Sequence, residues 1–148
     1  MGYFGALDIS ASALTAQRLR MDTISQNIAN AGTTRTDEGT PYRRRLVIFQ
    51  ERKSAGVPFS ECLSAVSRER FMGGGVKVAK IVEDESPFKR VYDPGHPDAD
   101  AEGYVEMPNV DIITEMVNMI SASRAYEANV TALNTTKSMA LKALEIGR

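Results

Sequence analysis

Apolar residues near the N-terminus recur every seven positions, and this spacing predicts a helix from Tyr3 to about Asn30. Its apolar stripe consists of Leu7, Leu14, Met21 and Ile28, with Phe4, Ala11 and Ile24 beside it. The stripe is narrow, because Arg18 and Ser25 interrupt its second column. Asn30-Ala31-Gly32 then supplies a stop signal, since asparagine and glycine tolerate the left-handed conformation that ends a helix.

The C-terminal segment from about Val110 to Ile146 contains no proline or glycine over thirty-seven residues, so one long helix is predicted there. Its seam alternates steps of four and three, as a coiled-coil seam does. The seam positions are Ile112, Met116, Met119, Ser123, Tyr126, Val130, Leu133, Lys137, Ala140 and Leu144. Such a helix would be roughly 55 Å long at about 1.5 Å per residue. A small domain cannot cover that length, so other chains are expected to bury part of it.

The middle of the chain carries β signals between turn-rich stretches. Thr33–Thr40 is polar and is predicted to be a loop. Arg45–Gln50 is rich in β-branched and aromatic residues, and Gly75–Glu83 partly alternates apolar with charged residues, so both are predicted strands. Ser86–Gly103 holds three prolines and two glycines and is predicted to be an irregular, turn-punctuated segment.

These elements predict an α+β fold that is mainly α. Long N- and C-terminal helices are expected to pair as a coiled coil, beside a small β-rich, irregular middle module. The expected divisions are 1–32 for the N-terminal helix, 33–108 for the middle module and 109–148 for the C-terminal helix. The alternative is a monomer in which a two-helix hairpin packs only on its own β module.

Composition narrows the possible functions. The 148 residues suffice for one domain with a hydrophobic core. Eighteen basic residues against nineteen acidic ones leave a net charge of -1, so nucleic acid is not an expected partner. The N-terminus lacks the pattern of a Sec signal peptide, and no run of eighteen apolar residues predicts membrane insertion. An extracytoplasmic role would therefore need another export route.

The candidates for catalytic or metal chemistry are weak, and no cofactor is expected. His96 is the single histidine and has no serine or cysteine nucleophile at a known spacing. A metal site with Asp93, Asp98 and Asp100 would lack the EF-hand spacing, so a turn held by side-chain to backbone bonds is favoured. Cys62 has no second cysteine or nearby base and is interpreted as a small, partly buried apolar residue.

Two further clusters invite a functional interpretation. Gly73-Gly74-Gly75 precedes a predicted strand, without the lysine and serine of a phosphate-binding loop, so a turn is favoured. Arg43-Arg44-Arg45 has only Tyr42 as an aromatic neighbour, which argues against base stacking. We interpret the three arginines as a solvated patch or as partners in salt bridges between subunits.

Both ends of the sequence resemble one known family. Ser12–Thr36, with its NIANAGT core, resembles the N-terminal segment shared by flagellar rod and hook proteins, and Asn109–Val130 is similar to their other shared segment. Gly75–Asp111, with YDPGHPDAD, resembles the proximal-rod members in particular. The similarity does not extend to Gln50–Met72. The motif residues that carry it are Asn27, Asn30, Arg124, Tyr126 and Asn129.

The resemblance implies a structural subunit and not an enzyme. Its terminal helices would pair and stack helically into the proximal rod, the drive shaft that transmits torque from the membrane ring to the hook. The implied partners are copies of the chain, other rod subunits, membrane-ring or rod-adaptor proteins and the flagellar type III export apparatus. The implied location is the periplasmic part of the flagellar basal body. The subunit-packing residues would be Leu7, Leu14, Met21, Ile28, Ile112, Met116, Met119, Tyr126, Val130, Leu133 and Leu144.

Two other function classes remain as alternatives at this point. A soluble coiled-coil adaptor or export chaperone would also carry long heptad helices. A small enzyme would have to use His96 and the acidic loop around it.

Overall fold

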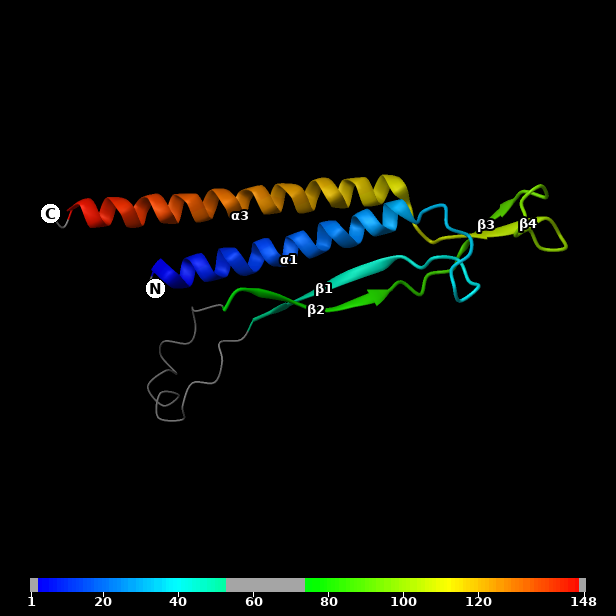
Figure 1. Cartoon of the computed structure of the whole chain (residues 1–148), viewed down its shortest axis with the longest axis horizontal. Helices are drawn as coiled ribbons and strands as arrows, with labels where there is room; N and C mark the ends of the chain where they lie inside the picture. Colours follow the sequence, from blue (N-terminus) through cyan, green and yellow to red (C-terminus); the bar gives the residue numbers. More distant parts are fainter. Residues whose placement is uncertain (1–2, 53–73, 147–148) are drawn as a thin grey trace, which may run out of the picture. The chain divides into compact units, whose positions relative to one another are not determined.

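The computed structural model describes residues 3–52 and 74–146. In these ranges the order of elements is α1 (Tyr3–Ala29), β1 (Arg45–Glu51), β2 (Val76–Glu83), β3 (Lys89–Tyr92), β4 (Tyr104–Met107) and α3 (Ile112–Ile146) (Figure 1). The fold is thus mixed, with long helices at both ends of the sequence and small sheets between them. The two terminal helices and the first two strands were predicted correctly. Cys62 and most of Gln50–Met72 lie outside the described residues.

The chain divides into two compact units. The first comprises Met1–Arg18, Phe49–Ala79 and Arg124–Arg148, and we call it the basic unit because its sequence has ten lysines and arginines against six acidic residues. The second comprises Leu19–Ile48 and Lys80–Ser123, and we call it the acidic unit because it has eight against thirteen. Both helices and the first two strands contribute to each unit.

Side chains cap the two long helices at the ends that lie in the acidic unit. At the end of α1, the Asn30 side-chain amide donates to the Gln26 carbonyl over 2.9 Å, and the Thr33 N–H donates to the Asn30 carbonyl. At the start of α3, the Asp111 carbonyl accepts the first helical hydrogen bond, from the N–H of residue 115. A hydrogen bond from Thr114 lowers the pKa of the Asp111 carboxyl, which therefore stays charged at the positive end of the helix dipole.

Strands β1 and β2 form a two-stranded sheet. The Arg52 N–H donates to the Gly75 carbonyl and the Asp84 N–H donates to the Arg44 carbonyl, so the strands are antiparallel. Gly75 has a φ of +91°, and a Cβ at this position would lie 2.3 Å from the Ser12 hydroxyl. That hydroxyl accepts a hydrogen bond from the Val76 N–H over 3.1 Å. Glycine is therefore required where β2 approaches α1 in the basic unit.

Strands β3 and β4 form an antiparallel hairpin in which Val91 pairs with Val105 and Tyr92 with Tyr104. The prediction of an irregular segment over residues 86–103 was wrong for residues 89–92, which form β3. The two tyrosine rings meet edge to face at 5.3 Å, a contact between positions twelve residues apart that local sequence rules do not detect. Gly103, with a φ of +81°, closes the loop beside the Tyr92 ring.

The most buried face of α1 is not the predicted apolar stripe. Its buried residues are Ala16, Thr23, Asn27 and Ile24, of which only Ile24 was placed beside the stripe, whereas Leu7, Leu14, Met21 and Ile28 are half-buried. Nine residues make two and a half helical turns, so Ala16 lies on the opposite side of the helix from Leu7. Small and polar residues therefore allow the closest packing, and the leucine column lies away from it.

The predicted seam of α3 is also divided between environments. Met119, Tyr126, Val130 and Leu133 are half-buried, whereas Ile112, Met116 and Leu144 are exposed. The fully buried positions are Glu115 and Ala122, neither of which belongs to the predicted stripe. The assignment of the stripe to contacts between subunits stays a prediction.

Candidate functional site

The side chain of Asn27, which is fully buried on α1, makes four hydrogen bonds within the acidic unit. Its amide nitrogen donates to the Arg45 carbonyl and to a Glu115 carboxylate oxygen, both at 2.9 Å. Its oxygen accepts the Tyr42 hydroxyl at 3.0 Å and the Arg45 N–H at 2.9 Å. All four hydrogen-bonding positions of the asparagine amide are therefore occupied inside the protein.

Glu115 is 1% exposed and is bound from two directions. One carboxylate oxygen accepts a hydrogen bond from the Asn27 amide. The other accepts hydrogen bonds from Nε and Nη2 of Arg44, at 3.0 and 2.5 Å. Because two guanidinium nitrogens bind it, the buried carboxylate has an opposite charge beside it and a fixed orientation. A buried carboxylate without such partners would cost several kcal/mol, so Arg44 and Asn27 are what allow it to be buried.

Asn109 extends the network along the backbone. Its side-chain oxygen accepts the Arg44 N–H at 2.8 Å, and its amide donates to the carbonyls of Asp84 and Ser86 at 2.9 and 3.3 Å. Asp84 also lies 3.7 Å from the Arg44 guanidinium. Asn109 therefore connects the chain just before α3 to the ends of the β1–β2 ribbon.

Tyr42 completes the group of residues around Asn27. Burial raises the pKa of its hydroxyl, Arg45 opposes the rise, and Glu83 and Glu115 add to it. The hydroxyl therefore stays protonated and able to donate to Asn27. We call Asn27, Tyr42, Arg44, Asn109 and Glu115 the polar clamp, because they join α1, β1, the end of β2 and α3 within the acidic unit.

The interpretation of the three consecutive arginines as a solvated or inter-subunit patch was wrong for Arg44, which binds the buried Glu115, and it stays a prediction for the half-buried Arg43 and the exposed Arg45. Arg44 belongs to the clamp, and the Arg43 guanidinium lies over the Phe88 ring at 4.5 Å. Arg45 lies over the Tyr42 ring at 5.8 Å and 3.6 Å from Glu83. All three therefore bind groups of their own chain.

The structure gives the five motif residues different roles. Asn27 is the centre of the clamp, and Asn30 caps α1. Asn129 donates to the Ala125 carbonyl of its own helix at 2.7 Å, Tyr126 is half-buried and Arg124 is exposed. Sequence reasoning missed the roles of Arg44, Asn109 and Glu115. The one available signal of such a role was Glu115, whose carboxylate lies among apolar residues at the start of α3.

The opposite side of the same helix is apolar and exposed. Ile113 and Val117, one turn apart, are 74% and 62% exposed, and the face that they define is continuous over the first turns of α3. We call this the α3 apolar face, and it consists of Ile112, Ile113, Met116, Val117 and Ile120. Its inner neighbour, Glu115, is 1% exposed, so the usual order of apolar inside and polar outside is reversed here.

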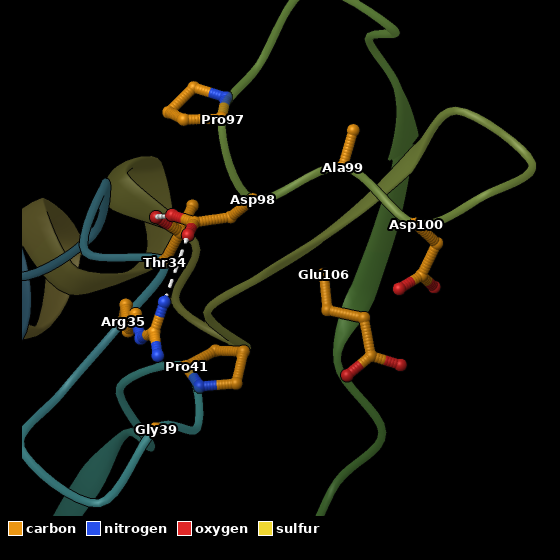
Figure 2. A pocket seen from close by; sticks show the side chains of 9 residues that line it. All are labelled: Thr34, Arg35, Gly39, Pro41, Pro97, Asp98, Ala99, Asp100 and Glu106. Carbon is orange, nitrogen blue, oxygen red and sulfur yellow. Dashed lines mark hydrogen bonds and ion pairs between the residues drawn. The ribbon is translucent and has the colours of Figure 1, made fainter.

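A polar cleft of about 530 Å³ lies between the loop after α1 and the loop of the β3–β4 hairpin. Asp98 points toward Thr34 and Arg35, and Asp100 and Glu106 lie apart from it (Figure 2). The Thr34 hydroxyl donates to Asp98 at 2.9 Å, and the Arg35 guanidinium forms an ion pair with it at 3.9 Å. These contacts join the two loops to each other.

The single histidine has a structural role in the hairpin loop. His96 Nδ1 accepts the Asp98 N–H at 3.1 Å, and Asp93 accepts the Gly95 N–H at 3.1 Å. The prediction of a turn held by side-chain to backbone bonds is therefore confirmed. Within residues 3–52 and 74–146, no three histidine, cysteine or acidic side chains converge as metal ligands would.

None of the helices in the described part of the chain combines the length and apolarity needed to span a membrane.

Comparison with known proteins shows the family. Residues 7–35 match the family described as "Flagella basal body rod protein", and residues 101–146 match "Flagellar basal body rod FlgEFG protein C-terminal". Both matches indicate the class of flagellar basal-body rod proteins, and the first includes Asn27 of the clamp.

Full-length relatives identify the member of that class. The chain is 56% identical to the flagellar basal-body rod protein FlgC of Bacillus subtilis and 47% identical to that of Escherichia coli, over 100% of each chain. It is 42% identical to FlgC of Aquifex aeolicus over 93% of this chain and 91% of the relative. The chain therefore belongs to the FlgC family, and it is a structural subunit of the flagellar basal-body rod.

Proposed function

We propose that the chain polymerises through its terminal helices as part of the proximal rod and transmits torque from the membrane ring to the hook. The observation that carries this proposal is the reversed polarity at the start of α3. On the side of the helix that faces the rest of the chain, Glu115 is buried, and on the other side Ile113 and Val117 are exposed. An exposed apolar face of this kind is typical of a surface that another protein covers.

The polar clamp gives the assembly surface a fixed position. Buried polar side chains that are fully bonded favour one register of two packed helices over others. Asn27 and Glu115 bond α1 directly to α3, so a shift of one helix along the other would leave both groups without partners. We infer that α1 and α3 continue from this point as a coiled-coil pair, with Met119, Tyr126, Val130 and Leu133 along its seam.

The remaining assignments follow from the same proposal. The leucine column of α1 (Leu7, Leu14, Met21 and Ile28) would contact neighbouring subunits, as would the exposed α3 positions Ile112, Met116 and Leu144. Residues 1–32 and 109–148 would then build the inner wall of the rod, and residues 33–108 its outer part. The partners would be copies of the chain, other rod subunits and rod-adaptor or membrane-ring proteins. The chain would reach the periplasm through the flagellar type III apparatus, and it would act without catalysis.

A matched pair of variants tests this function in cells. Ile113→Glu places a charge at the centre of the α3 apolar face, and Gln26→Glu adds the same charge at an exposed position of α1 in the same unit. We expect Ile113→Glu to be produced and exported but to stop rod completion, because an unpaired carboxylate in a covered interface costs several kcal/mol. Gln26→Glu should swim normally.

Three measurements separate the possible causes of a motility defect. Swimming, periplasmic subunit level and basal-body images are recorded for both strains. Complete rods in the Ile113→Glu strain would contradict the proposal, and a missing periplasmic subunit would indicate an export or folding defect instead.

A further inference from the structure

The β3–β4 hairpin turns two aromatic rings toward solvent. Tyr92 and Tyr104 are 64% and 42% exposed, and they pair across the two strands, so they lie on the same face. Val105, which follows Tyr104 on β4, belongs to the opposite face and is 2% exposed. The hairpin therefore packs on the acidic unit through Val105 and presents both tyrosines on its outer face.

Contacts inside the hairpin hold the two rings in place before any partner binds. The rings meet edge to face at 5.3 Å. Gly103 lies so close to Tyr92 that a Cβ on it would come within 2.9 Å of the ring, and within 3.3 Å of Pro94. An aromatic side chain whose position is already fixed loses little conformational entropy on binding, and tyrosine is enriched at protein–protein interfaces.

Carboxylates flank the two rings. Residues 93–106 contain five acidic side chains and no lysine or arginine. Asp93 follows Tyr92 directly, and the Asp100 N–H donates to the Tyr104 carbonyl at 2.8 Å. Each tyrosine therefore has an exposed aspartate beside it along the backbone. We call Tyr92, Tyr104, Asp93 and Asp100 the hairpin patch.

The charges of the two aspartates in the hairpin patch are not balanced within the described part of the chain. Two other acidic residues of the hairpin have cations beside them, since Asp98 pairs with Arg35 at 3.9 Å and Glu106 with Arg90 at 3.6 Å. Among the described residues, neither aspartate of the patch forms an ion pair. The patch thus combines two exposed rings with uncompensated negative charge.

This combination is complementary to a cation, and to arginine more than to lysine. The face of an aromatic ring and a carboxylate both attract positive charge. The planar guanidinium stacks on a ring and binds a carboxylate through two nitrogens, which the ammonium group of lysine cannot do. The chain itself contains such an arrangement, in which Arg45 lies over the Tyr42 ring at 5.8 Å and 3.6 Å from Glu83. The hairpin patch offers the same groups without the arginine.

We propose that the hairpin patch binds an arginine side chain of a different protein. A symmetric contact between two copies would bring two negatively charged hairpins together, which disfavours a second copy at this patch. The inference goes beyond the proposed function, because the patch shares no residue with the α3 apolar face. It adds an attachment surface for a partner that exposes arginine.

A titration of the purified chain tests the chemistry of the patch. The probes are a short peptide of alternating arginine and glycine and a lysine–glycine peptide of the same length and charge. Amide chemical shifts of the isotope-labelled chain report both the affinity and the residues involved. We expect the arginine peptide to shift residues 89–107 and to bind about threefold or more tightly than the lysine peptide.

Single variants divide the interaction into its parts. Tyr92→Leu removes the ring and should weaken binding about three- to fivefold, whereas Tyr92→Phe keeps the ring and should stay within about twofold of wild type. Asp100→Asn should weaken binding about threefold. The control Asp22→Asn removes the same charge at an exposed position of α1 in the same unit and should change binding by less than about 1.5-fold. All these positions are exposed, so the variants should fold.

Several outcomes would overturn the proposal. Equal affinity for the two peptides, or equal effects of Asp100→Asn and Asp22→Asn, would reduce the patch to general negative charge. Unchanged binding by Tyr92→Leu would remove the ring from the site. A chitin oligosaccharide that shifts the same amides more strongly than the arginine peptide would make the patch a carbohydrate-binding surface, and self-association that Tyr92→Leu abolishes would make a copy the occupant. The titration requires no rods, so its failure leaves the proposed function intact.

Discussion

The two sides of α3 at its start differ in a way that reverses the usual pattern of a globular protein. The inner side holds Glu115 with two carboxylate oxygens fully bonded, and the outer side exposes Ile113, Met116, Val117 and Ile120 to solvent. Helices of isolated globular proteins normally bury such apolar residues. The proposed function assigns these two sides two purposes, one within the chain and one beyond it.

The polar inner side and the apolar outer side of α3 suit different roles. The polar clamp offers little net free energy, but it is satisfied only when α1 and α3 meet in one register. The α3 apolar face has no such restriction and gains free energy from whichever apolar surface covers it. Under the proposed function, the clamp fixes the position of the two helices inside the subunit, and the α3 apolar face supplies the free energy of assembly.

The largest effect on the folded subunit is expected from Asn27→Ala. The change leaves the Tyr42 hydroxyl, both Arg45 backbone groups and one Glu115 oxygen without their partner, so the free energy of unfolding should fall by about 3–4 kcal/mol. Urea unfolding followed by circular dichroism measures this loss. The control Asn30→Ala removes two hydrogen bonds at a half-buried position, one to the Gln26 carbonyl and one from the Thr33 hydroxyl, and should cost about 1 kcal/mol. Equal losses in the two variants would show that Asn27 has no special role.

Glu115→Gln separates charge from shape in the clamp. The amide has nearly the same size, but it removes the nearer of the two carboxylates beside the Arg44 guanidinium, which is only 21% exposed. Only the more distant Asp84 carboxylate, 3.7 Å away, would still balance the Arg44 charge. We expect a loss of about 2–3 kcal/mol, against less than about 0.5 kcal/mol for Glu127→Gln at an exposed position of the same helix. A Glu115→Gln chain as stable as wild type would show that the ion pair is dispensable.

These residues also show what the sequence could and could not predict. Helical spacing and β-branched runs predicted both helices and the first two strands, because those elements follow local rules. The clamp depends on contacts between positions up to eighty-eight residues apart, and nothing in the neighbourhood of Asn27 or Glu115 specifies the other. The apolar spacing of α1 included one buried residue, Ile24, but it did not predict the burial of Ala16 and Thr23, which show no apolar periodicity.

Leu133→Asp tests the remainder of the α3 seam. Leu133 is half-buried in the single chain, so the monomer should lose only about 1–2 kcal/mol, while rod completion should be abolished because every repeated contact carries the same charge. The exposed neighbour Thr135→Asp should be tolerated. Motility, periplasmic subunit level and basal-body images are needed for both strains. Normal rods with Leu133→Asp would remove this residue from the seam.

The smallest effect concerns pH. Hydrogen bonds from the Ser86 side chain and backbone, followed by the nearby Arg44 charge, lower the pKa of Asp84. A lowered pKa in the folded state contributes stability above the unfolded pKa, and this contribution is lost as pH falls through the folded value. Ser86→Ala should therefore cost about a few tenths of a kcal/mol at neutral pH and progressively less in acid. Ser138→Ala, whose hydroxyl bonds only a backbone carbonyl, should show no such pH dependence.

Solvent access to the two sides of α3 tests the account most directly. Single cysteines are placed at Val117, 62% exposed, and at Ala122, 0% exposed, in a Cys62→Ser background, and a thiol reagent is applied to the monomer and to purified basal bodies. We predict that the cysteine at 117 reacts in the monomer and is protected in the rod, whereas the one at 122 is protected in both. Equal labelling at 117 in monomer and rod would contradict the claim that the α3 apolar face is an assembly surface.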